Sequence, residues 1–143
     1  MSPFCYPATV AVDAAGFYLV TFPDVPEAGT DAETREEARR EAVDALIAAL
    51  GGYVHNRRLI PKPSKAQPGQ VMITLPTLVA AKLALYEAMC ETGISNVELG
   101  RRLGISEGAV RRLLDLDHRS HIGQVEAGLQ ALGHRLVVGV QAA

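Results

Sequence analysis

The side chains best suited to chemistry in this 143-residue chain are arginines that gather in its C-terminal half. They occur as the pairs Arg101-Arg102 and Arg111-Arg112, with Arg119 shortly after. Guanidinium groups bind phosphate oxygens and the edge of guanine in a bidentate manner. The net charge is −2, so any affinity for nucleic acid must come from this local cluster rather than from overall charge. One copy should bind weakly, which favours a dimer.

These arginines lie in the segment 96–115, whose spacing predicts a helix-turn-helix. Gly100 is small where the second helix must come close, and Gly104 can adopt the left-handed conformation that turns the chain. Ser95-Asn96-Val97-Glu98 has the pattern of a capping box, and Ser106 is the expected N-cap of the second helix. Four apolar positions would let the two helices pack at a steep angle: Leu99, Leu103, Val110 and Leu113.

In such a motif the start of the second helix enters the major groove while basic groups around it hold phosphates. Arg111 and Arg112 are the main candidates for base or phosphate contact. His118 and His121 flank Arg119, where a phosphate contact and a plain helix-ending loop are equal alternatives. An ordinary helical hairpin is the alternative interpretation of the whole pattern. The other candidate DNA-binding residues are Asn96, Arg101, Arg102, Ser106, Glu107, Gly108 and Arg119.

The N-terminal part of the chain predicts a small sheet. Residues 6–12 alternate between apolar and polar side chains, and Gly16 turns the chain into a second strand at 17–22. Together they predict a β-hairpin. Prolines end the second strand, and residues 28–31 form a possible third strand.

A helix and a last strand complete this domain. Thr34-Arg35-Glu36-Glu37 opens the helix as a capping box, and Gly51-Gly52 is expected to end it. The proline-rich segment 61–69 predicts a linker, and residues 71–75 predict a strand. The order β-β-β-α-β indicates an α+β layer with one helix over a small sheet. The expected inner face of the helix consists of Ala38, Ala42, Leu46, Ala49 and Leu50.

The C-terminal part should be helical. A helix from Pro76 to Gly93 would present Val79, Leu83, Tyr86 and Cys90 to a core, and a later helix at 122–132 would present Val125, Leu129 and Leu132. Residues 135–140 form a β-branched run that predicts a strand without a partner in its own domain. Pairing with the same strand of a second copy would satisfy its backbone groups, which indicates a homodimer.

Two remaining observations concern the environment of the protein. Cys5 and Cys90 lie far apart without a CxxC or histidine-rich partner, which is typical of free thiols in a reducing compartment. The sequence has no signal-peptide pattern, and its longest apolar run is far short of a membrane span. A cytoplasmic protein without a metal site is expected.

The segment 5–65 contains an ordered set of motifs: Tyr6-Pro7, Gly16-Phe17-Tyr18, the run 22–26 (FPDVP), Gly29, the helix with inner alanines, and the exit 59–64 (LIPKPS). In this combination the segment resembles the HicB antitoxin family. Ala28 departs from the common pattern, so the loop after Pro26 should differ somewhat. The helix-turn-helix that follows resembles the DNA-binding domain of one HicB subgroup.

This resemblance implies a truncated ribonuclease H-like domain without catalysis, at residues 1–65 plus a strand at 70–75. It would bind and inactivate HicA, a toxin that cleaves messenger RNA with a histidine. Residues 76–143 would be the DNA-binding and dimerisation domain that represses the operon. The rim proposed for toxin binding is Tyr18, Phe22, Asp24 and Glu27. Phe17 and Leu19 lie on the opposite strand face, and which face packs under the helix stays open.

A ribonuclease H-like fold also raises the question of a magnesium-dependent nuclease, which needs converging carboxylates. Asp13 and Asp24 occupy turn-type positions, and nothing places the three candidates Asp13, Asp24 and Asp31 on one sheet face. We therefore expect no catalytic residue and no cofactor, and hence no enzyme.

The alternative function is a helix-turn-helix regulator that senses a small ligand through its N-terminal domain. It would need a roomy pocket with converging polar groups, for which the sheet has few inward polar positions.

Overall fold

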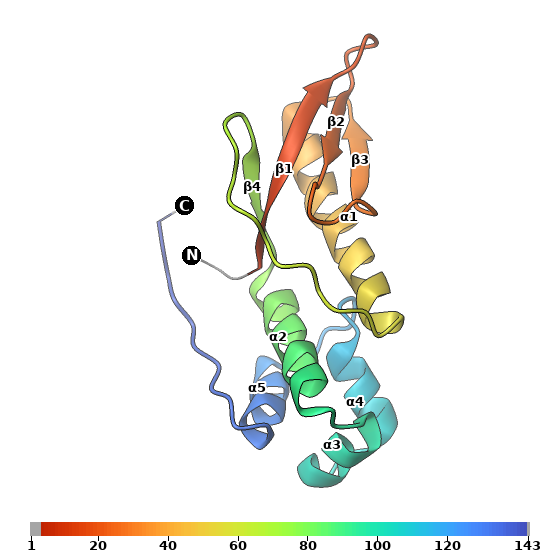
Figure 1. Cartoon of the computed structure of the whole chain (residues 1–143), viewed down its shortest axis with the longest axis vertical. Helices are drawn as coiled ribbons and strands as arrows, with labels where there is room; N and C mark the ends of the chain where they lie inside the picture. The colour runs from red at the N-terminus through yellow and green to blue at the C-terminus, as the bar shows by residue number, and fades with distance from the viewer. Residues whose placement is uncertain (1–3, 143) are drawn as a thin grey trace. The chain divides into compact units, whose positions relative to one another are not determined.

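The computed structural model describes residues 4–142 and divides the chain into two compact units, Met1–Pro76 and Thr77–Ala143. The first unit combines an antiparallel four-stranded sheet, in the order β3-β2-β1-β4, with one helix (Figure 1). Its elements are β1 (Cys5–Val12), β2 (Tyr18–Thr21), β3 (Gly29–Ala32), α1 (Arg35–His55) and β4 (Val71–Thr74). The predicted α+β class and the order β-β-β-α-β are confirmed.

The hairpin between β1 and β2 forms for local reasons. The Asp13 carboxylate accepts hydrogen bonds from the backbone N–H groups of Ala15 and Phe17, both at 2.9 Å. Gly16 closes the turn at φ +88°, a conformation that favours glycine. The register then pairs Val10 with Val20, and β3 extends the ladder on the far side of β2.

Helix α1 begins as predicted but continues further. The Thr34 hydroxyl accepts from the N–H of Glu37 and caps the helix. The predicted stop at Gly51-Gly52 is wrong, since the helix runs on to His55. The added turn places Tyr53 in the core with its hydroxyl 2.7 Å from Glu27, and this packing outweighs the low helix propensity of two glycines. The buried face consists of Ala38, Ala42, Leu46, Leu50 and Tyr53.

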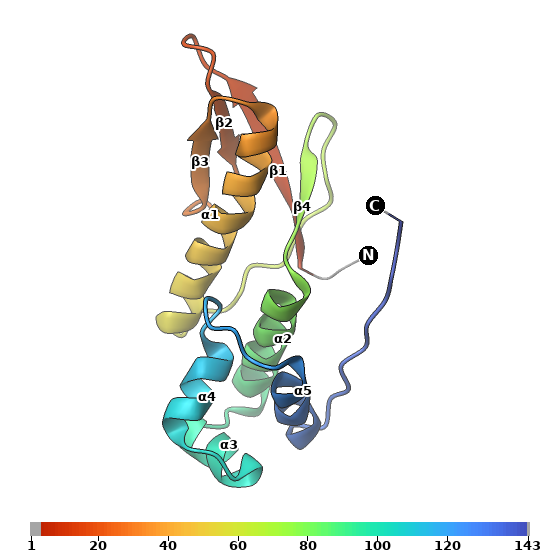
Figure 2. The ribbon, with the colours of Figure 1, turned by 180° about the vertical axis from the view of Figure 1, so that it is seen from behind.

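The helix covers one face of the sheet (Figure 2). Val20 lies on this covered face and is buried. A small cavity between the two layers is lined by sheet and helix side chains together: Val10, Val20, Arg35, Ala38, Arg39, Ala42, Val71 and Ile73. Leu19, which alternates with Val20, is 37% exposed on the other face, and the preceding Phe17 is 36% exposed. The alternative left open by the sequence is therefore resolved.

Side-chain contacts hold the segment between α1 and β4 to the sheet domain, including one from Gln70 to Thr9 at 3.2 Å. The Tyr6 hydroxyl donates to the carbonyl of Pro61 at 2.7 Å. Asp24 accepts from both the backbone N–H and the hydroxyl of Ser64. Arg58 forms an ion pair with Glu27 at 3.1 Å. The chain then returns as β4, which pairs antiparallel with β1.

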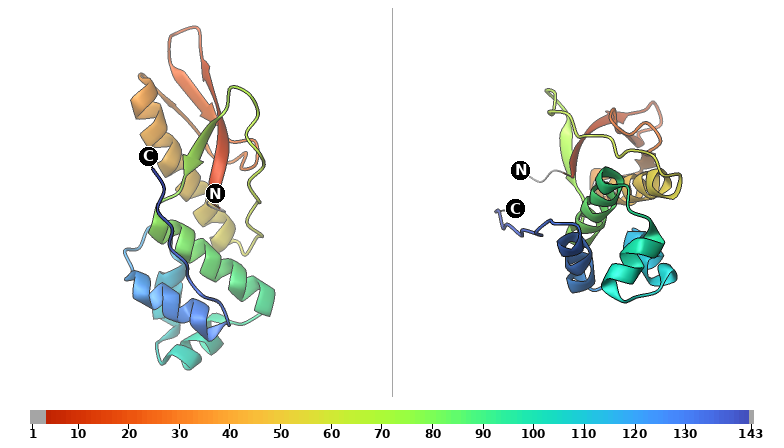
Figure 3. Two further views of the ribbon diagram at one scale, coloured as in Figure 1. Left: turned by 90° about the vertical axis from the view of Figure 1, so that its left-hand side faces the viewer. Right: turned by 60° about the horizontal axis from the view of Figure 1, so that its bottom comes forward.

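The second unit contains α2 (Thr77–Thr92), α3 (Asn96–Leu103), α4 (Glu107–Leu114) and α5 (Ile122–Ala131). Helix α5 lies beside α2, and α3 packs against α4 (Figure 3). One apolar core joins them, formed by Ala81, Leu85, Ala88, Met89, Leu99, Val110, Leu113, Val125 and Leu129. None of the helices in the part of the chain that the structure describes is long and apolar enough to span a bilayer.

One prediction for this unit needs correction, and a second, which requires another copy of the chain, is not tested by a single chain. Val79, Leu83 and Tyr86 of α2 are buried as predicted, but Cys90 is exposed because the helix presents Ala88 and Met89 to the core instead. The predicted strand at 135–140 is not formed within one described chain, since residues 134–142 pair with no strand. Leu136 packs against the core of this unit, while Val137 and Val140 are among the most exposed apolar residues.

Candidate nucleic-acid interface

Local interactions build the α3–α4 pair. The Ser95 hydroxyl accepts from the N–H of Glu98 at 3.0 Å, and the Ser106 hydroxyl accepts from the N–H of Ala109 at 3.1 Å. Gly104 ends α3 in the left-handed conformation, at φ +69°. Both predicted N-caps and the predicted turn residue are confirmed, and together they give two short helices with only a tight turn between them.

Gly100 lets the two helices approach. It is buried, and a Cβ built on it would lie 2.7 Å from the carbonyl oxygen of Ile105 and 3.4 Å from a methyl of Val110. Real Cβ atoms do not come this close to a backbone oxygen. The close packing also buries Leu99 and Leu113, as the sequence predicted. The pair therefore holds α4 in one orientation, with its polar side facing solvent.

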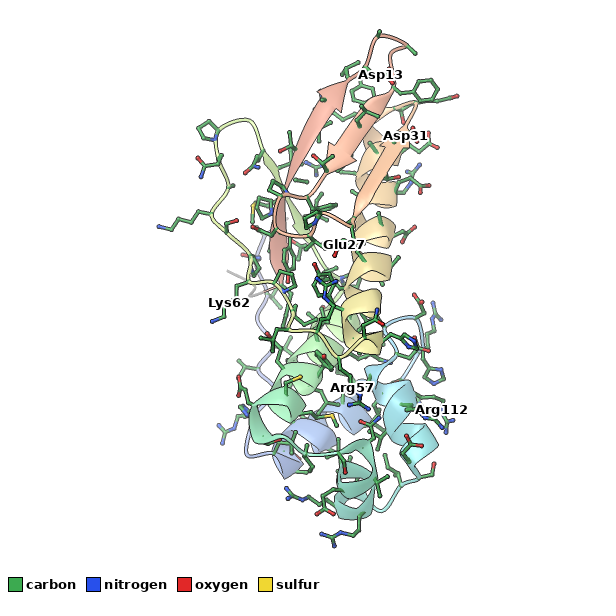
Figure 4. The ribbon with its side chains drawn as sticks, turned by 45° about the vertical axis from the view of Figure 1, so that its right-hand side comes forward. Asp13, Glu27, Asp31, Arg57, Lys62 and Arg112 are labelled. Carbon is green, nitrogen blue, oxygen red and sulfur yellow. The ribbon has the colours of Figure 1, made fainter. Side chains whose placement is uncertain are left out.

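The polar surface of the pair is rich in arginine, but carboxylates engage several of these side chains. Glu98 forms a two-point contact with Arg101, at 2.6 and 2.8 Å, and also contacts Arg102 at 3.3 Å. Glu107 forms an ion pair with Arg111 at 3.2 Å. Any phosphate that binds here must compete with these carboxylates. The side chain of Arg112 extends from α4 into solvent (Figure 4), and no ion pair involves it among the described residues.

The hydrogen bonds from Arg101 lower the pKa of Glu98 from its ordinary 4.5 to about 2. A carboxyl with a lowered folded-state pKa stabilises the fold above the unfolded value, and this contribution is lost as the pH falls through 4.5 toward 2. We expect the difference in unfolding free energy between the wild type and Glu98→Gln to shrink over this range. Urea unfolding between pH 7 and pH 2.5 measures it. Glu91→Gln, at an exposed position on α2, is the matched control, and an equal pH dependence of both variants would contradict the prediction.

The remaining candidates have different surroundings. Asn96 is the half-buried first residue of α3, and Ser106 uses its hydroxyl for capping. Gly108 lies in the first turn of α4, where a side chain would meet the guanidinium groups of Arg111 and Arg112 at 3.9 Å. Arg119 is exposed in the loop that follows α4. Arg112 and Arg119 are therefore better placed to contact DNA than the candidates that cap a helix or form ion pairs.

Sequence reasoning missed Lys82, which lies inside α2. It is fully buried, and its ammonium group donates to the backbone carbonyls of Arg112, Asp115 and His118 and contacts the hydroxyl of Ser120. Burial lowers the pKa of this lysine, and the nearby Asp115 carboxylate opposes the shift. The sequence offered no distinctive signal for this role, since the same helix also contains the charged residues Glu87 and Glu91.

The residues predicted for toxin binding mostly have partners within the chain. Phe22 is 1% exposed, so its assignment to an exposed rim is wrong: it points into the core with Val20. Tyr18 is half-buried and lies under the guanidinium of Arg35, at 5.3 Å from its ring centre. Asp24 and Glu27 bind the segment after α1, and the hydrogen bond from Tyr53 lowers the pKa of the Glu27 carboxyl.

The carboxylates considered for metal chemistry remain separate. Asp13 lies at the hairpin tip and Asp31 on β3 (Figure 4), while Asp24 holds Ser64. No group of three histidine, cysteine or acidic side chains could hold a metal ion within residues 4–142. The N-terminal unit therefore presents separate acidic side chains rather than a metal site. The C-terminal unit presents a rigid helix pair with arginines on its surface.

Comparison with known proteins identifies the family. The model of a family described as a HicB-like antitoxin of bacterial toxin–antitoxin systems matches residues 5–84. This chain belongs to the HicB antitoxin family. It is 43% identical to "Antitoxin HicB" of Pseudomonas fluorescens (strain Pf0-1) over 121 residues, which covers 84% of this chain and 83% of the relative.

Further HicB relatives match over nearly the full length. "Antitoxin HicB 1" of Photorhabdus laumondii is 37% identical over 136 residues, 95% of this chain and 86% of the relative. "Antitoxin HicB" of Escherichia coli (strain K12) is 38% identical over 131 residues, 92% of this chain and 95% of the relative. The resemblance noted in the sequence is confirmed, and the protein is an antitoxin of a toxin–antitoxin system.

Proposed function

We propose that this HicB protein neutralises a HicA-type, mRNA-cleaving ribonuclease through its N-terminal unit and represses its own operon through the α3–α4 pair, a DNA-binding helix-turn-helix. The observation that supports repression most directly is the close approach at Gly100, which holds α4 with Arg112 facing solvent. Such a rigid, arginine-bearing helix suits the major groove. A gel-shift titration with the DNA upstream of its own operon tests this role, and steep weakening by salt is expected because phosphate contacts release counterions.

The ligand-sensing alternative has less support. The cavity between the sheet and α1 measures about 30 Å³, and most of its lining is apolar. That space suits one water molecule rather than a metabolite, since small-molecule sites are typically ten times larger. An enzymatic role lacks support from converging carboxylates within residues 4–142.

For toxin binding we propose the sheet face that α1 leaves uncovered. Phe17 and Leu19 are exposed there, and large apolar side chains anchor interfaces when a partner covers them. Asp31 lies on the neighbouring strand and pairs in register with Leu19, which adds a negative charge beside the apolar patch. Residues 1–75 hold nine acidic against seven basic side chains, a balance that favours the approach of a basic, RNA-handling partner.

Leu19→Glu in the full-length protein should abolish neutralisation, because it puts a charge where the toxin would exclude water. The expected result is loss of growth rescue on co-expression with the toxin, and a fall in affinity of about 100-fold in a titration of the purified partners. Val12→Glu is the control, since Val12 is also an exposed strand residue but lies on the opposite face. Rescue by Leu19→Glu at the wild-type level would exclude this face as the toxin site.

We also propose that two copies associate through the C-terminal segment. Val137, Val138 and Val140 are exposed in one chain, and β-strand pairing between copies would cover them. Deleting residues 134–143 should convert a dimer into a monomer in sedimentation experiments and weaken operator binding about 100-fold, because half-sites would then be bound singly. Deletion of the hairpin tip, residues 14–15, is the control. A dimer that survives the C-terminal deletion would locate the interface elsewhere.

A further inference from the structure

Lys82 connects α2 to the end of α4 by an unusual arrangement. Its ammonium lies 2.9 Å from the carbonyl oxygen of Arg112, 2.7 Å from that of Asp115 and 2.8 Å from that of His118. The Ser120 hydroxyl lies 2.9 Å away and completes the set. Lys82 is the one charged side chain that is fully buried in residues 4–142.

This arrangement adds to the ordinary end of a helix, where the Asp115 backbone N–H already reaches the carbonyls of Arg111 and Arg112. The last carbonyls of a helix lack partners within it, and water or a cap residue normally satisfies them. Here a buried cation from another helix binds a carbonyl in the last turn of α4 and two carbonyls beyond it. Removing an ammonium from water is unfavourable, and good hydrogen bonds must offset the lost hydration. The three carbonyl contacts are the compensation that the structure provides.

The backbone held in this way includes the residues best placed for DNA. Arg112 contributes one of the bound carbonyls, while its side chain is exposed. Arg119 lies between His118 and Ser120, both of which contact Lys82. The ammonium thus holds the backbone at Arg112 itself. It also holds the two residues on either side of Arg119. Three oxygens bound from one point leave the loop 115–120 little freedom.

From this geometry we infer that Lys82 is a positioning residue for DNA binding, which sets Arg112 and Arg119 on the phosphate backbone without contacting DNA itself. The inference rests on the proposed repressor function. It assigns a role in recognition to a buried residue of α2, outside the α3–α4 pair.

The test is Lys82→Met in the full-length protein, titrated with the DNA upstream of its operon at several salt concentrations. We expect operator affinity to fall at least tenfold while circular dichroism remains that of the folded protein. The slope of log affinity against log salt should become shallower by about 1–2, because each lost phosphate contact removes about 0.9 from it. A variant that is merely less stable has fewer active molecules but an unchanged slope. Lys62→Met, at an exposed position, is the control.

A double-mutant cycle with Arg119→Ala sharpens the result. If Lys82 positions Arg119, then Arg119→Ala weakens binding in the wild type but has little further effect in Lys82→Met. Additive losses together with an unchanged salt slope would overturn the inference, as would wild-type affinity of Lys82→Met. If the wild type itself does not bind the upstream DNA, the proposed repressor function fails first.

Chemical rescue covers the case in which Lys82→Met does not fold. In Lys82→Ala, added propylammonium can occupy the vacated space and present the missing N–H donors. We expect it to restore binding and the salt slope relative to tetramethylammonium at the same ionic strength, because the latter has no N–H donor. A variant that stays unfolded with propylammonium, or that folds without regaining affinity, would overturn the inference.

Discussion

Replacing Gly100 by alanine should destabilise the C-terminal unit and abolish operator binding, although it adds only one methyl group. The new Cβ would lie 2.7 Å from the carbonyl oxygen of Ile105, and this backbone atom can move only if α3 and α4 separate. Overpacking of this kind costs about 1–3 kcal/mol. In a unit of this size we expect the melting temperature to fall by roughly 5 °C or more, which calorimetry of the full-length protein would resolve.

The matched control is Gly123→Ala in α5. A Cβ at Gly123 meets nothing within 4 Å, so this substitution should be neutral or slightly stabilising, as alanine generally is in a helix. Both variants change glycine to alanine within a helix of the same unit. Equal melting temperatures for the two would show that the helix pair tolerates separation and that α4 is not rigidly held.

Loss of the two arginines of α4 should weaken DNA binding strongly. Arg112→Ala is expected to weaken operator binding about tenfold or more, because a base or phosphate contact of this type contributes on the order of 1–3 kcal/mol. Arg111 forms an ion pair with Glu107, which must break before Arg111 can contact DNA. The single substitution Arg111→Ala should therefore weaken operator binding less than Arg112→Ala does. The double variant should lose about 100-fold in a fluorescence titration.

Arg40→Ala serves as the control for these charge changes, because Arg40 is an exposed arginine of α1 in the other unit. Toxin neutralisation should be intact in all of these variants, because each substituted arginine lies on a helix and outside the sheet proposed to bind the toxin. Operator affinity at the wild-type level in the double variant would exclude α4 as the recognition helix.

The features predicted correctly from the sequence are those that depend on near neighbours. The N-caps at Ser95 and Ser106 and the turn at Gly104 each involve residues within three or four positions. Hydrophobic spacing likewise placed Leu99 and Val110 in the core. These signals are local in the chain, so a single sequence contains them in full.

The errors arose where distant residues decide the outcome. Gly51-Gly52 is a local stop signal, but packing of Tyr53 against Glu27 overrides it. The burial of Phe22 depends on which sheet face α1 covers, and alternation along a strand has no information on that choice. Lys82 acts on carbonyls that lie 30–36 positions further along the chain, beyond any local pattern.

The position of β4 in the sheet has a consequence for synthesis on the ribosome. Strand β1 has β2 on one side and β4 on the other, and Cys5 contacts Thr74 across 69 positions of sequence. While α1 and the proline-rich segment are being made, one edge of β1 has no partner, and open strand edges invite aggregation. Premature termination anywhere before residue 71 would therefore release a polypeptide with a permanently open edge, a substrate for chaperones and proteases rather than a shorter antitoxin.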